Sequence, residues 1–276
     1  MPELPEVETI RAGLEPLIVG REIKHVICHR ANLRYPLPNL AALVGQSVTG
    51  MRRRSKYLLF DLASERLETS QTLVWHLGMT GQFHVLPHHA KTGTHEHVHV
   101  ELSDGQSLRY RDARRFGYAG LLPSTQLESH AWFSKLGPEP LSDAFNGEHL
   151  TALCAGRKAP IKNLIMDASI VVGVGNIYAS ESLFRAGIHP ARAAGRISSA
   201  RLALLVETIK AVLAEAIEAG GSTISDFVHA DGKPGYFAHQ FQVYGRAGKK
   251  CLHCERTIKR ITQAGRSSFL CSFCQR

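Results

Sequence analysis

Four cysteines near the end of the chain constrain its fold more than any other feature. They form two pairs, each with two intervening residues, and sixteen residues separate the pairs: Cys251, Cys254, Cys271 and Cys274. This spacing is typical of a four-cysteine zinc site, in which thiolates fill every coordination position and none is left for a reactive water. We therefore predict a small finger that binds one structural Zn2+ and needs it to fold. The alternative is four thiols without a metal.

The segment between the two cysteine pairs predicts a short hairpin. Residues 257–262 and 267–270 have the composition of strands, and the stretch 263–266 between them suits a turn. Such a hairpin would project Arg266 from a tip that the metal stiffens.

The start of the chain offers a candidate nucleophile. It begins Met-Pro-Glu-Leu-Pro, and removal of Met1 would leave the ring nitrogen of Pro2 as a free secondary amine beside Glu3, which can move protons. An α-amino group titrates near ~7.7–8.0 and a lysine near ~10.4, so the terminal amine is far less protonated at neutral pH. Two alternatives to a nucleophilic Pro2 stay open. Met-Pro is a common start of protein chains and need have no chemical role, and a retained Met1 would leave Pro2 as an unreactive amide.

A helix is predicted directly after this start. Pro5 suits its first position, and one apolar face follows at helical spacing: Val7, Ile10, Leu14 and Leu17. The positive end of this helix would disfavour protonation of the nearby amine.

The charge of the chain favours a polyanionic partner. Among 276 residues, Lys and Arg outnumber Asp and Glu by 33 to 24, which gives a formal net charge of +9. We expect nucleic acid rather than a membrane, because no basic amphipathic helix stands out and no apolar run reaches about twenty residues. Acidic residues at the start contradict a signal peptide. The expected location is the cytoplasm, in association with the nucleoid.

The order of patterns predicts an α+β chain with three parts. Alternating strands fill 22–122 and indicate an antiparallel β-sandwich capped by the first helix, with Asp104-Gly105 as a hairpin turn. Breakers at 136–140 precede helical patterns at 148–154, 161–167, 176–186 and 199–217. We predict a catalytic sandwich domain over 1–130, a helical DNA-binding domain over 131–238 and a zinc finger over 239–276.

Two loops of the sandwich carry residues that suit DNA. His-Leu-Gly-Met-Thr-Gly at 76–81 places Met79 between glycines at a turn, although an isolated Met is more often part of a core. The stretch 111–117 offers arginines beside Phe116. An exposed Met and Phe with Arg can open a base stack and fill the space of a flipped base. The cations at 52–56 either lie on a solvated edge or grip phosphates.

A glycine turn at 172–176 precedes one of the predicted helices. Its backbone N–H groups can bind a phosphate at the helix start. A dinucleotide fold is the competing interpretation, but the third glycine of that fingerprint is absent.

These segments together resemble the bacterial formamidopyrimidine-DNA glycosylase family from end to end. The matching motifs are PELPEVET, RRRSKYLLF, HLGMTG, LRYRDARRFG, VVGVGNIYASESLFRAGIHP, DGKPGYF and the cysteine finger. The resemblance implies a β-sandwich, a helix–two-turns–helix domain and a zinc finger. Two departures from the family pattern are Ala113, where the family often has proline, and the histidine-rich stretch 84–96.

The resemblance also implies roles for individual residues. Pro2 matches the Schiff-base nucleophile and Glu3 the proton donor. Lys56 matches the lysine that assists β-elimination, and Arg266 the finger arginine linked to δ-elimination. The residues that match DNA phosphate contacts are His95, Arg114, Arg157, Lys162 and Asn176.

Three further residues match the triad that the family inserts into the base stack. They are Met79, Arg114 and Phe116, and the resemblance places Arg114 opposite the orphaned cytosine. The loop 220–236 matches the one that closes over a flipped 8-oxoguanine.

The function implied is a bifunctional DNA glycosylase and abasic-site lyase of base excision repair. It would excise oxidised purines from double-stranded DNA as a monomer, with zinc as its one, structural cofactor. One rival is a zinc-finger DNA binder without enzymatic activity, whose affinity would survive loss of Pro2. Another is the endonuclease VIII-like branch, which acts on oxidised pyrimidines; Leu4 and the arginine-phenylalanine pair favour the purine branch.

Overall fold

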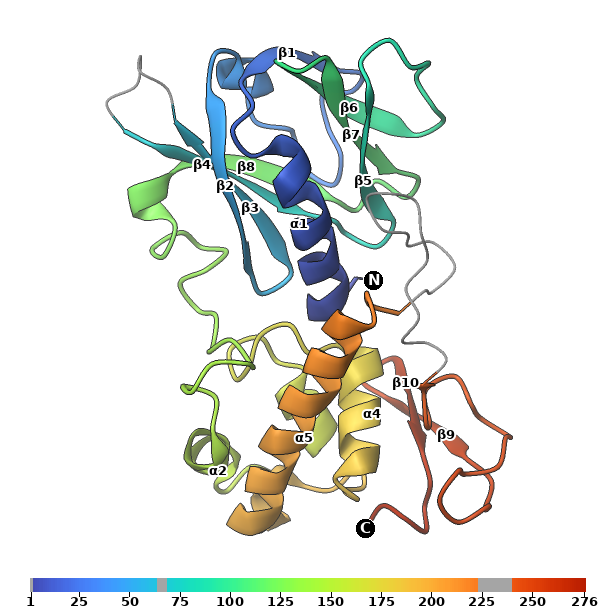
Figure 1. Cartoon of the computed structure of the whole chain (residues 1–276). Helices are drawn as coiled ribbons and strands as arrows, with labels where there is room; N and C mark the ends of the chain where they lie inside the picture. The colour runs from blue at the N-terminus through green and yellow to red at the C-terminus, as the bar shows by residue number, and fades with distance from the viewer. Residues whose placement is uncertain (1, 64–68, 223–239) are drawn as a thin grey trace. The chain divides into compact units, whose positions relative to one another are not determined.

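The computed structural model describes residues 2–63, 69–222 and 240–276, which form two compact units (Figure 1). Unit 1 consists of Pro2, Glu6–Ser134 and the described part of Gly220–Gly235. Unit 2 consists of Glu3–Pro5, Lys135–Ala219 and the described part of Tyr236–Arg276. The boundaries expected at 130 and 238 stay predictions. Most of the loop expected to close over a flipped base, 223–236, lies outside the described residues.

Unit 1 contains two four-stranded antiparallel sheets, which have the strand orders β1-β6-β7-β5 and β2-β3-β4-β8. The strands are β1 (Ile23–Cys28), β2 (Ser47–Arg54), β3 (Tyr57–Ala63), β4 (Gln71–His76), β5 (Gly81–Pro87), β6 (Glu96–Leu102), β7 (Gln106–Asp112) and β8 (Tyr118–Pro123). Two short 3-10 helices, η1 (Leu40–Leu43) and η2 (Ser124–Gln126), are also present. The hairpin expected at Asp104-Gly105 is confirmed: Gly105 has a φ of +80° between β6 and β7.

Helix α1 (Leu4–Ile18) packs on the sandwich, so the predicted helix-capped sandwich is confirmed. Its residues from Val7 onward share one core with both sheets. The predicted apolar face needs one correction, because Leu17 is 42% exposed whereas Ile18 is fully buried. Ile18 continues the four-residue spacing from Leu14 and so stays on the buried side.

The cations at 52–54 lie just ahead of β3 and themselves form the end of β2. Arg52 donates two hydrogen bonds of 2.6 Å to Asp61, and Arg53 donates one of 2.9 Å to Glu8. Part of this basic stretch therefore stabilises unit 1 itself.

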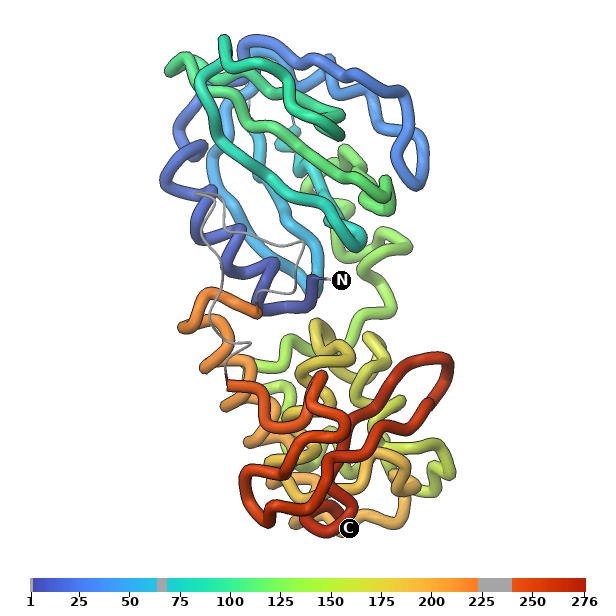
Figure 2. The backbone as a smooth tube through the Cα atoms, turned by 90° about the vertical axis from the view of Figure 1, so that its right-hand side faces the viewer, coloured from blue at the N-terminus to red at the C-terminus, as the bar shows by residue number. Residues whose placement is uncertain are grey.

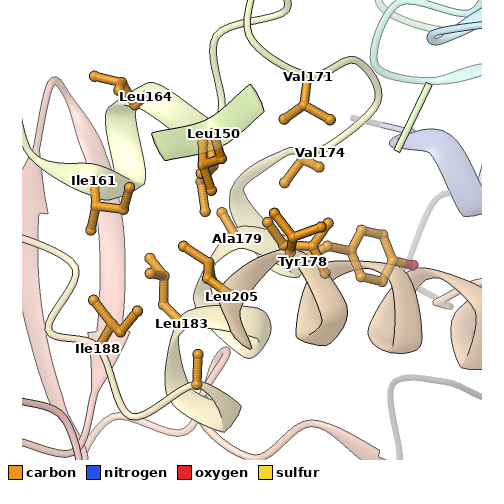
Figure 3. Packing of buried hydrophobic residues seen from close by; sticks show 14 of the residues in the cluster. Leu150, Ile161, Leu164, Val171, Val174, Tyr178, Ala179, Leu183, Ile188 and Leu205 are labelled. Carbon is orange, nitrogen blue, oxygen red and sulfur yellow. The ribbon is translucent and has the colours of Figure 1, made fainter. Parts of the chain in front are cut away.

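Unit 2 is built around helices α2 (Gly147–Cys154), α3 (Ile161–Ile165), α4 (Asn176–Arg185) and α5 (Ser199–Glu218), with a 3-10 turn, η3 (Ala194–Arg196). Figure 3 shows part of their shared core, including Leu150, Tyr178, Leu183 and Leu205. The predicted apolar face of α5 is confirmed, since seven of its residues are buried: Leu202, Leu205, Val206, Ile209, Val212, Leu213 and Ala216. Ser198 occupies the N-cap position, but its side chain makes no capping hydrogen bond.

The C-terminal finger contains the predicted hairpin, formed by β9 (Lys259–Gln263) and β10 (Arg266–Leu270) (Figure 2). The turn is tighter than expected. Only Ala264 and Gly265 lie between the strands, both at positive φ. Arg266 is consequently the first residue of β10, paired with Gln263.

Within the described residues, no helix is both long and apolar enough to cross a membrane.

Candidate nucleic-acid interface and zinc centre

The three residues expected to enter the base stack lie on two loops of unit 1, and we call them the wedge. Met79 lies between β4 and β5, whereas Arg114 and Phe116 lie between β7 and β8. Met79 and Phe116 are 36% and 41% exposed, so the structure keeps two large apolar side chains out of the core. The guanidinium carbon of Arg114 lies 4.8 Å from the centre of the Phe116 ring, a cation–π contact that ties these two together.

A buried carboxylate organises both wedge loops. Asp112 is fully buried, and its oxygens accept hydrogen bonds from the Gly117 N–H at 2.8 Å, the Tyr110 hydroxyl at 3.2 Å and the Thr80 hydroxyl at 2.5 Å. Burial, and next the charge of Asp112, hold the pKa of Tyr110 well above its ordinary value, so this hydroxyl stays a donor. Sequence reasoning missed Asp112 as an organiser, because a buried acid leaves no periodic signal.

The loops also approach each other closely at Gly78. This residue has a φ of +68°, and a Cβ there would overlap the backbone of Phe116 and Gly117. A glycine is therefore required on steric grounds, which explains the residue before Met79.

Lys56 occupies the two-residue turn between β2 and β3, next to Ser55 at a φ of 55°. An aromatic cluster stiffens this hairpin. The hydroxyl groups of Tyr57 and Tyr118 lie 2.9 Å apart, and the ring of Tyr118 stacks on the ring of His76. Burial lowers the pKa of His76 to about 4, with further lowering by the positive charge of Lys56. His76 is therefore neutral at physiological pH, and its Nδ1 accepts the Gly78 N–H at 3.0 Å.

His95 is exposed, at a φ of 65°, just before β6. The loop that leads to it is held by Arg109, which is 1% exposed. Its guanidinium donates to four backbone carbonyl groups, those of Pro87, His88, Ala90 and Lys91, and to the carboxylate of Glu96. The histidine-rich stretch thus folds around one buried arginine. Of the described residues, only the four finger cysteines form a group of three or more potential metal ligands.

In unit 2, the carboxylate of Glu3 lies at the N-terminus of α4. Its oxygens accept hydrogen bonds from three N–H groups: those of Gly175 at 2.8 Å, Ile177 at 3.0 Å and Tyr178 at 3.4 Å. These donors and the helix dipole stabilise the ionised carboxylate. Pro2, which precedes Glu3, is buried.

This contact bears on the glycine turn at 172–176. The Gly175 N–H of the turn and the Ile177 N–H of α4 bind the carboxylate of Glu3, and a phosphate contact of the turn stays a prediction. Gly175 leaves no room for a side chain, because a Cβ there would overlap the Glu3 carboxyl group. Residues 172 positions apart in the chain meet here, which no local pattern could reveal.

Lys162 is brought together with Asn176 and the finger hairpin. It is 1% exposed, and its ammonium donates to the Asn176 side chain at 2.6 Å, the Ser268 hydroxyl at 2.7 Å and the Ser267 carbonyl at 3.2 Å. Burial lowers the pKa of Lys162 to about 8, an effect that Glu3 opposes and Arg266 strengthens. The donors of Lys162 are thus used inside unit 2, and a phosphate contact by this residue stays a prediction.

A cavity of about 280 Å3 opens beside this cluster, lined by Lys162, Asn163, Met166, Gln263, Ala264 and Arg266. Arg266 is exposed there and positively charged, which suits an anionic group. Arg157 is exposed after α2, and its backbone bonds to Cys154 and Gly195, so its side chain lies on a fixed turn.

The finger cysteines form a metal centre. Their four sulfur atoms all lie within 4.8 Å of one another, with Cys251 and Cys274 3.9 Å apart and Cys254 and Cys271 3.5 Å apart. A tetrahedral zinc with bonds of about 2.3 Å requires sulfur atoms about 3.8 Å apart. The cluster therefore fits one structural Zn2+, as the spacing predicted.

The finger joins the helices through a second buried carboxylate that sequence reasoning missed. Glu181 of α4 accepts the N–H groups of Gln242, Val243 and Tyr244 at 2.7–3.0 Å, ahead of the first finger cysteine, Cys251. Nothing in the sequence of the helix indicates this distant partner.

Three family models match the chain. They are the formamidopyrimidine-DNA glycosylase N-terminal domain over residues 1–119, the formamidopyrimidine-DNA glycosylase H2TH domain over 136–228, and the zinc finger found in FPG and IleRS over 248–276. Similar proteins include the formamidopyrimidine-DNA glycosylases of Syntrophotalea carbinolica, 49% identical over 100% of both chains, and of Shewanella oneidensis, 47% identical over 100% of this chain and 99% of that one.

Solved structures agree with this match. Lactococcus lactis Fpg in complex with DNA that contains an abasic site is 32% identical with a TM-score of 0.90, over 99% of both chains. The MutM (Fpg) protein of Thermus thermophilus is 39% identical with a TM-score of 0.88, over 99% of this chain and 98% of that one. MutM in complex with DNA containing carbocyclic 8-oxo-G is 33% identical with a TM-score of 0.90, over 100% of both chains. The chain belongs to the formamidopyrimidine-DNA glycosylase family.

Proposed function

We propose that this chain excises oxidised purines from double-stranded DNA through the amine of Pro2 and then cuts the strand by β,δ-elimination. Membership of the family makes the chain a DNA glycosylase of base excision repair. The substrate range, the lyase steps and the residue roles are the proposal.

The observation that carries the proposal is the likeness to relatives solved with abasic-site DNA and with carbocyclic 8-oxo-G DNA, over nearly the whole of each chain. The residues of this chain support it in two ways. Glu3 is buried and fixed directly after Pro2, and the wedge is held exposed on two locked loops.

Base removal begins when Pro2, with Met1 removed, attacks C1′ of the damaged nucleotide as the bond from C1′ to the base breaks. The nitrogen must then lose its proton to become an iminium. Glu3 rests as a carboxylate on the N-terminus of α4 and can accept that proton. It can return the proton to O4′ as the sugar ring opens, which completes the Schiff base.

Strand cleavage follows from the same intermediate. The cationic iminium draws electrons from C1′ and acidifies the C2′ proton, so loss of that proton expels the 3′ phosphate. Lys56 assists this β-elimination from its stiffened turn, and Arg266 assists δ-elimination, which expels the 5′ phosphate. The zinc supplies folding energy to the finger that carries Arg266.

Binding relies on side chains outside the reacting centre. His95, Arg114 and Arg157 are exposed, and we assign them to phosphate contacts, which a net charge of +9 supports. Asn176 is held by Lys162 at the start of α4 and is assigned to the same role. The chain acts as a monomer in the cytoplasm, on the DNA of the nucleoid.

The experiment is a panel of matched duplexes in single-turnover assays. The panel contains 8-oxoguanine opposite cytosine, a formamidopyrimidine opposite cytosine, thymine glycol opposite adenine, and an undamaged control. We expect release of both oxidised purines, strand scission at both sites and little action on thymine glycol. Preference for thymine glycol would contradict the purine assignment, and tight binding without any scission would contradict the enzymatic one.

A further inference from the structure

We propose that the hydroxyl group of Thr80 is the latch that holds the two wedge loops in one arrangement, and that Thr80 is therefore a positioning residue for lesion opening. The inference deepens the proposed function and rests on it, because the wedge needs a base stack to enter.

The latch is visible in two hydrogen bonds that one side chain makes. The Thr80 hydroxyl donates to a carboxylate oxygen of Asp112 at 2.5 Å and accepts the Arg114 N–H at 3.0 Å. Thr80 directly follows Met79 in the first loop, whereas Arg114 lies near the start of the second. One hydroxyl group therefore joins the loop that carries Met79 to the loop that carries Arg114 and Phe116.

The neighbouring hydrogen bonds explain why this hydroxyl matters. Asp112 holds the far end of the second loop through the Gly117 N–H, and this bond does not involve the first loop. His76 holds the first loop through the Gly78 N–H without touching the second. Each of these bonds stiffens one loop, whereas the two bonds of Thr80 connect one loop to the other.

Rigidity is what the wedge requires. Three side chains must enter one gap in the base stack together. A loop that moves independently would have to be ordered during insertion, which costs conformational entropy. A hydrogen bond from a hydroxyl to a buried carboxylate is stronger than one between neutral groups, so it can fix the two loops before insertion. Loss of the hydroxyl should slow opening of the intact duplex and spare chemistry that needs no opening.

The test compares Thr80→Val with Thr80→Ser. Valine keeps the shape of threonine and loses both hydrogen bonds, whereas serine keeps the hydroxyl. Two substrates separate opening from chemistry: a duplex with 8-oxoguanine opposite cytosine, and a single-stranded oligonucleotide with a preformed abasic site. We expect Thr80→Val to lower kcat/KM on the duplex by about tenfold, the loss expected for one charged hydrogen bond. Cleavage of the single strand should stay within about twofold of wild type, and Thr80→Ser should recover most duplex activity.

A matched control lies in the same unit. Thr72 is fully buried, and its hydroxyl donates to Asp61 at 3.0 Å, away from the two wedge loops. Thr72→Val removes the same kind of bond, so it reports the effect of lost stability alone. Melting temperatures of both valine variants show how far each is destabilised, and Thr72→Val should keep duplex activity.

A second readout follows the wedge itself. With 2-aminopurine next to the lesion, the fluorescence rise that reports unstacking should slow in Thr80→Val and not in Thr72→Val. Equal duplex activity in wild type and Thr80→Val would overturn the latch, as would equal losses in both valine variants or on both substrates. If wild type cleaves neither substrate, the proposed function fails first, and that result is distinct from a failure of the latch.

Discussion

Glu3 and Glu181 show how one residue type serves two purposes in unit 2. Each is a buried carboxylate that accepts hydrogen bonds from three backbone N–H groups. The donors to Glu3 lie at the start of α4, and the donors to Glu181 lie in the segment ahead of Cys251. Both should stabilise unit 2 to a similar extent, but only Glu3 follows the proposed nucleophile.

A matched pair of substitutions separates these purposes. Glu3→Gln and Glu181→Gln each replace one accepting oxygen by an amide, so we expect each to lower the free energy of unfolding by about 1.5–3 kcal/mol. Only Glu3→Gln should lower excision of 8-oxoguanine by about 100-fold or more, the range typical of a lost general acid–base group. Urea unfolding and single-turnover excision measure the two effects. Equal losses of excision would show that Glu3 acts through folding alone.

Lys56 tests the lyase half of the proposal. Lys56→Ala should lower the rate of strand cleavage at a preformed abasic site by about tenfold or more, while affinity for uncleavable DNA changes by about threefold or less. The reason is that a lysine placed for elimination acts on the transition state, whereas a phosphate contact acts on binding. Lys24→Ala is the control, since Lys24 pairs with Glu22 on the surface of the same unit. An effect of Lys56→Ala confined to affinity would remove Lys56 from the chemistry.

At the scale of elements, the finger depends on its metal. Cys251→Ser removes one of the four zinc ligands, so bound zinc should fall from about one equivalent to nearly none. The finger should then lose its fold, because zinc binding contributes roughly 10–16 kcal/mol to folding such fingers. Affinity for lesion DNA should fall together with the zinc content, measured by metal analysis and by titration of a fluorescent duplex. Cys28→Ser is the control, because Cys28 is exposed and outside the cluster. Normal DNA affinity in zinc-free protein would contradict this dependence.

Lys162 links α3, the start of α4 and β10, and it should make stability depend on pH. Its pKa is about 8 in the folded chain and 10.5 ordinarily, so between these values the unfolded chain binds more protons. Stability due to this group therefore rises with pH across that window and is lowest below pH 8, where both states are protonated. We expect the unfolding free energy of wild type relative to Lys162→Met to rise by on the order of 2 kcal/mol from pH 8 to pH 10. If the difference in unfolding free energy between the two proteins does not change from pH 8 to pH 10, the three hydrogen bonds keep the ammonium charged throughout this range.

The elements themselves were largely predictable from the sequence. The spacing of Leu202, Leu205 and Val206 indicates the buried face of α5, and Asp104-Gly105 marks the hairpin of β6 and β7, because these patterns depend on neighbours in the chain. The cysteine spacing likewise identifies the zinc site, since a four-thiolate centre needs its ligands in two close pairs.

The contacts that position the site were not predictable in the same way. Glu3 meets Gly175 across 172 positions, and Arg53 meets Glu8 across 45, and such pairs leave no periodic trace. A phosphate-binding turn is a reasonable expectation for 172–176, and no local pattern there indicates the carboxylate that Glu3 supplies. Buried polar groups need partners, and which partner is chosen depends on the whole fold.

At the scale of the molecule, the residues assigned to the proposed chemistry come from both compact units. Unit 1 carries Pro2, Lys56 and the wedge, and unit 2 carries Glu3, the Lys162 cluster and the finger with Arg266. The proposed mechanism therefore assigns DNA contacts to groups of each unit. A net charge of +9 should make these contacts weaken steeply as salt rises.

The most direct test of the central claim is borohydride trapping on a duplex that contains 8-oxoguanine opposite cytosine. Reduction converts the iminium into a stable amine, and mass spectrometry of the digested complex then locates the cross-linked residue. The proposed chemistry predicts one adduct, on an N-terminal Pro2 from which Met1 has been removed. An adduct on a lysine, or tight binding of the same duplex with no adduct, would contradict Pro2 as the nucleophile.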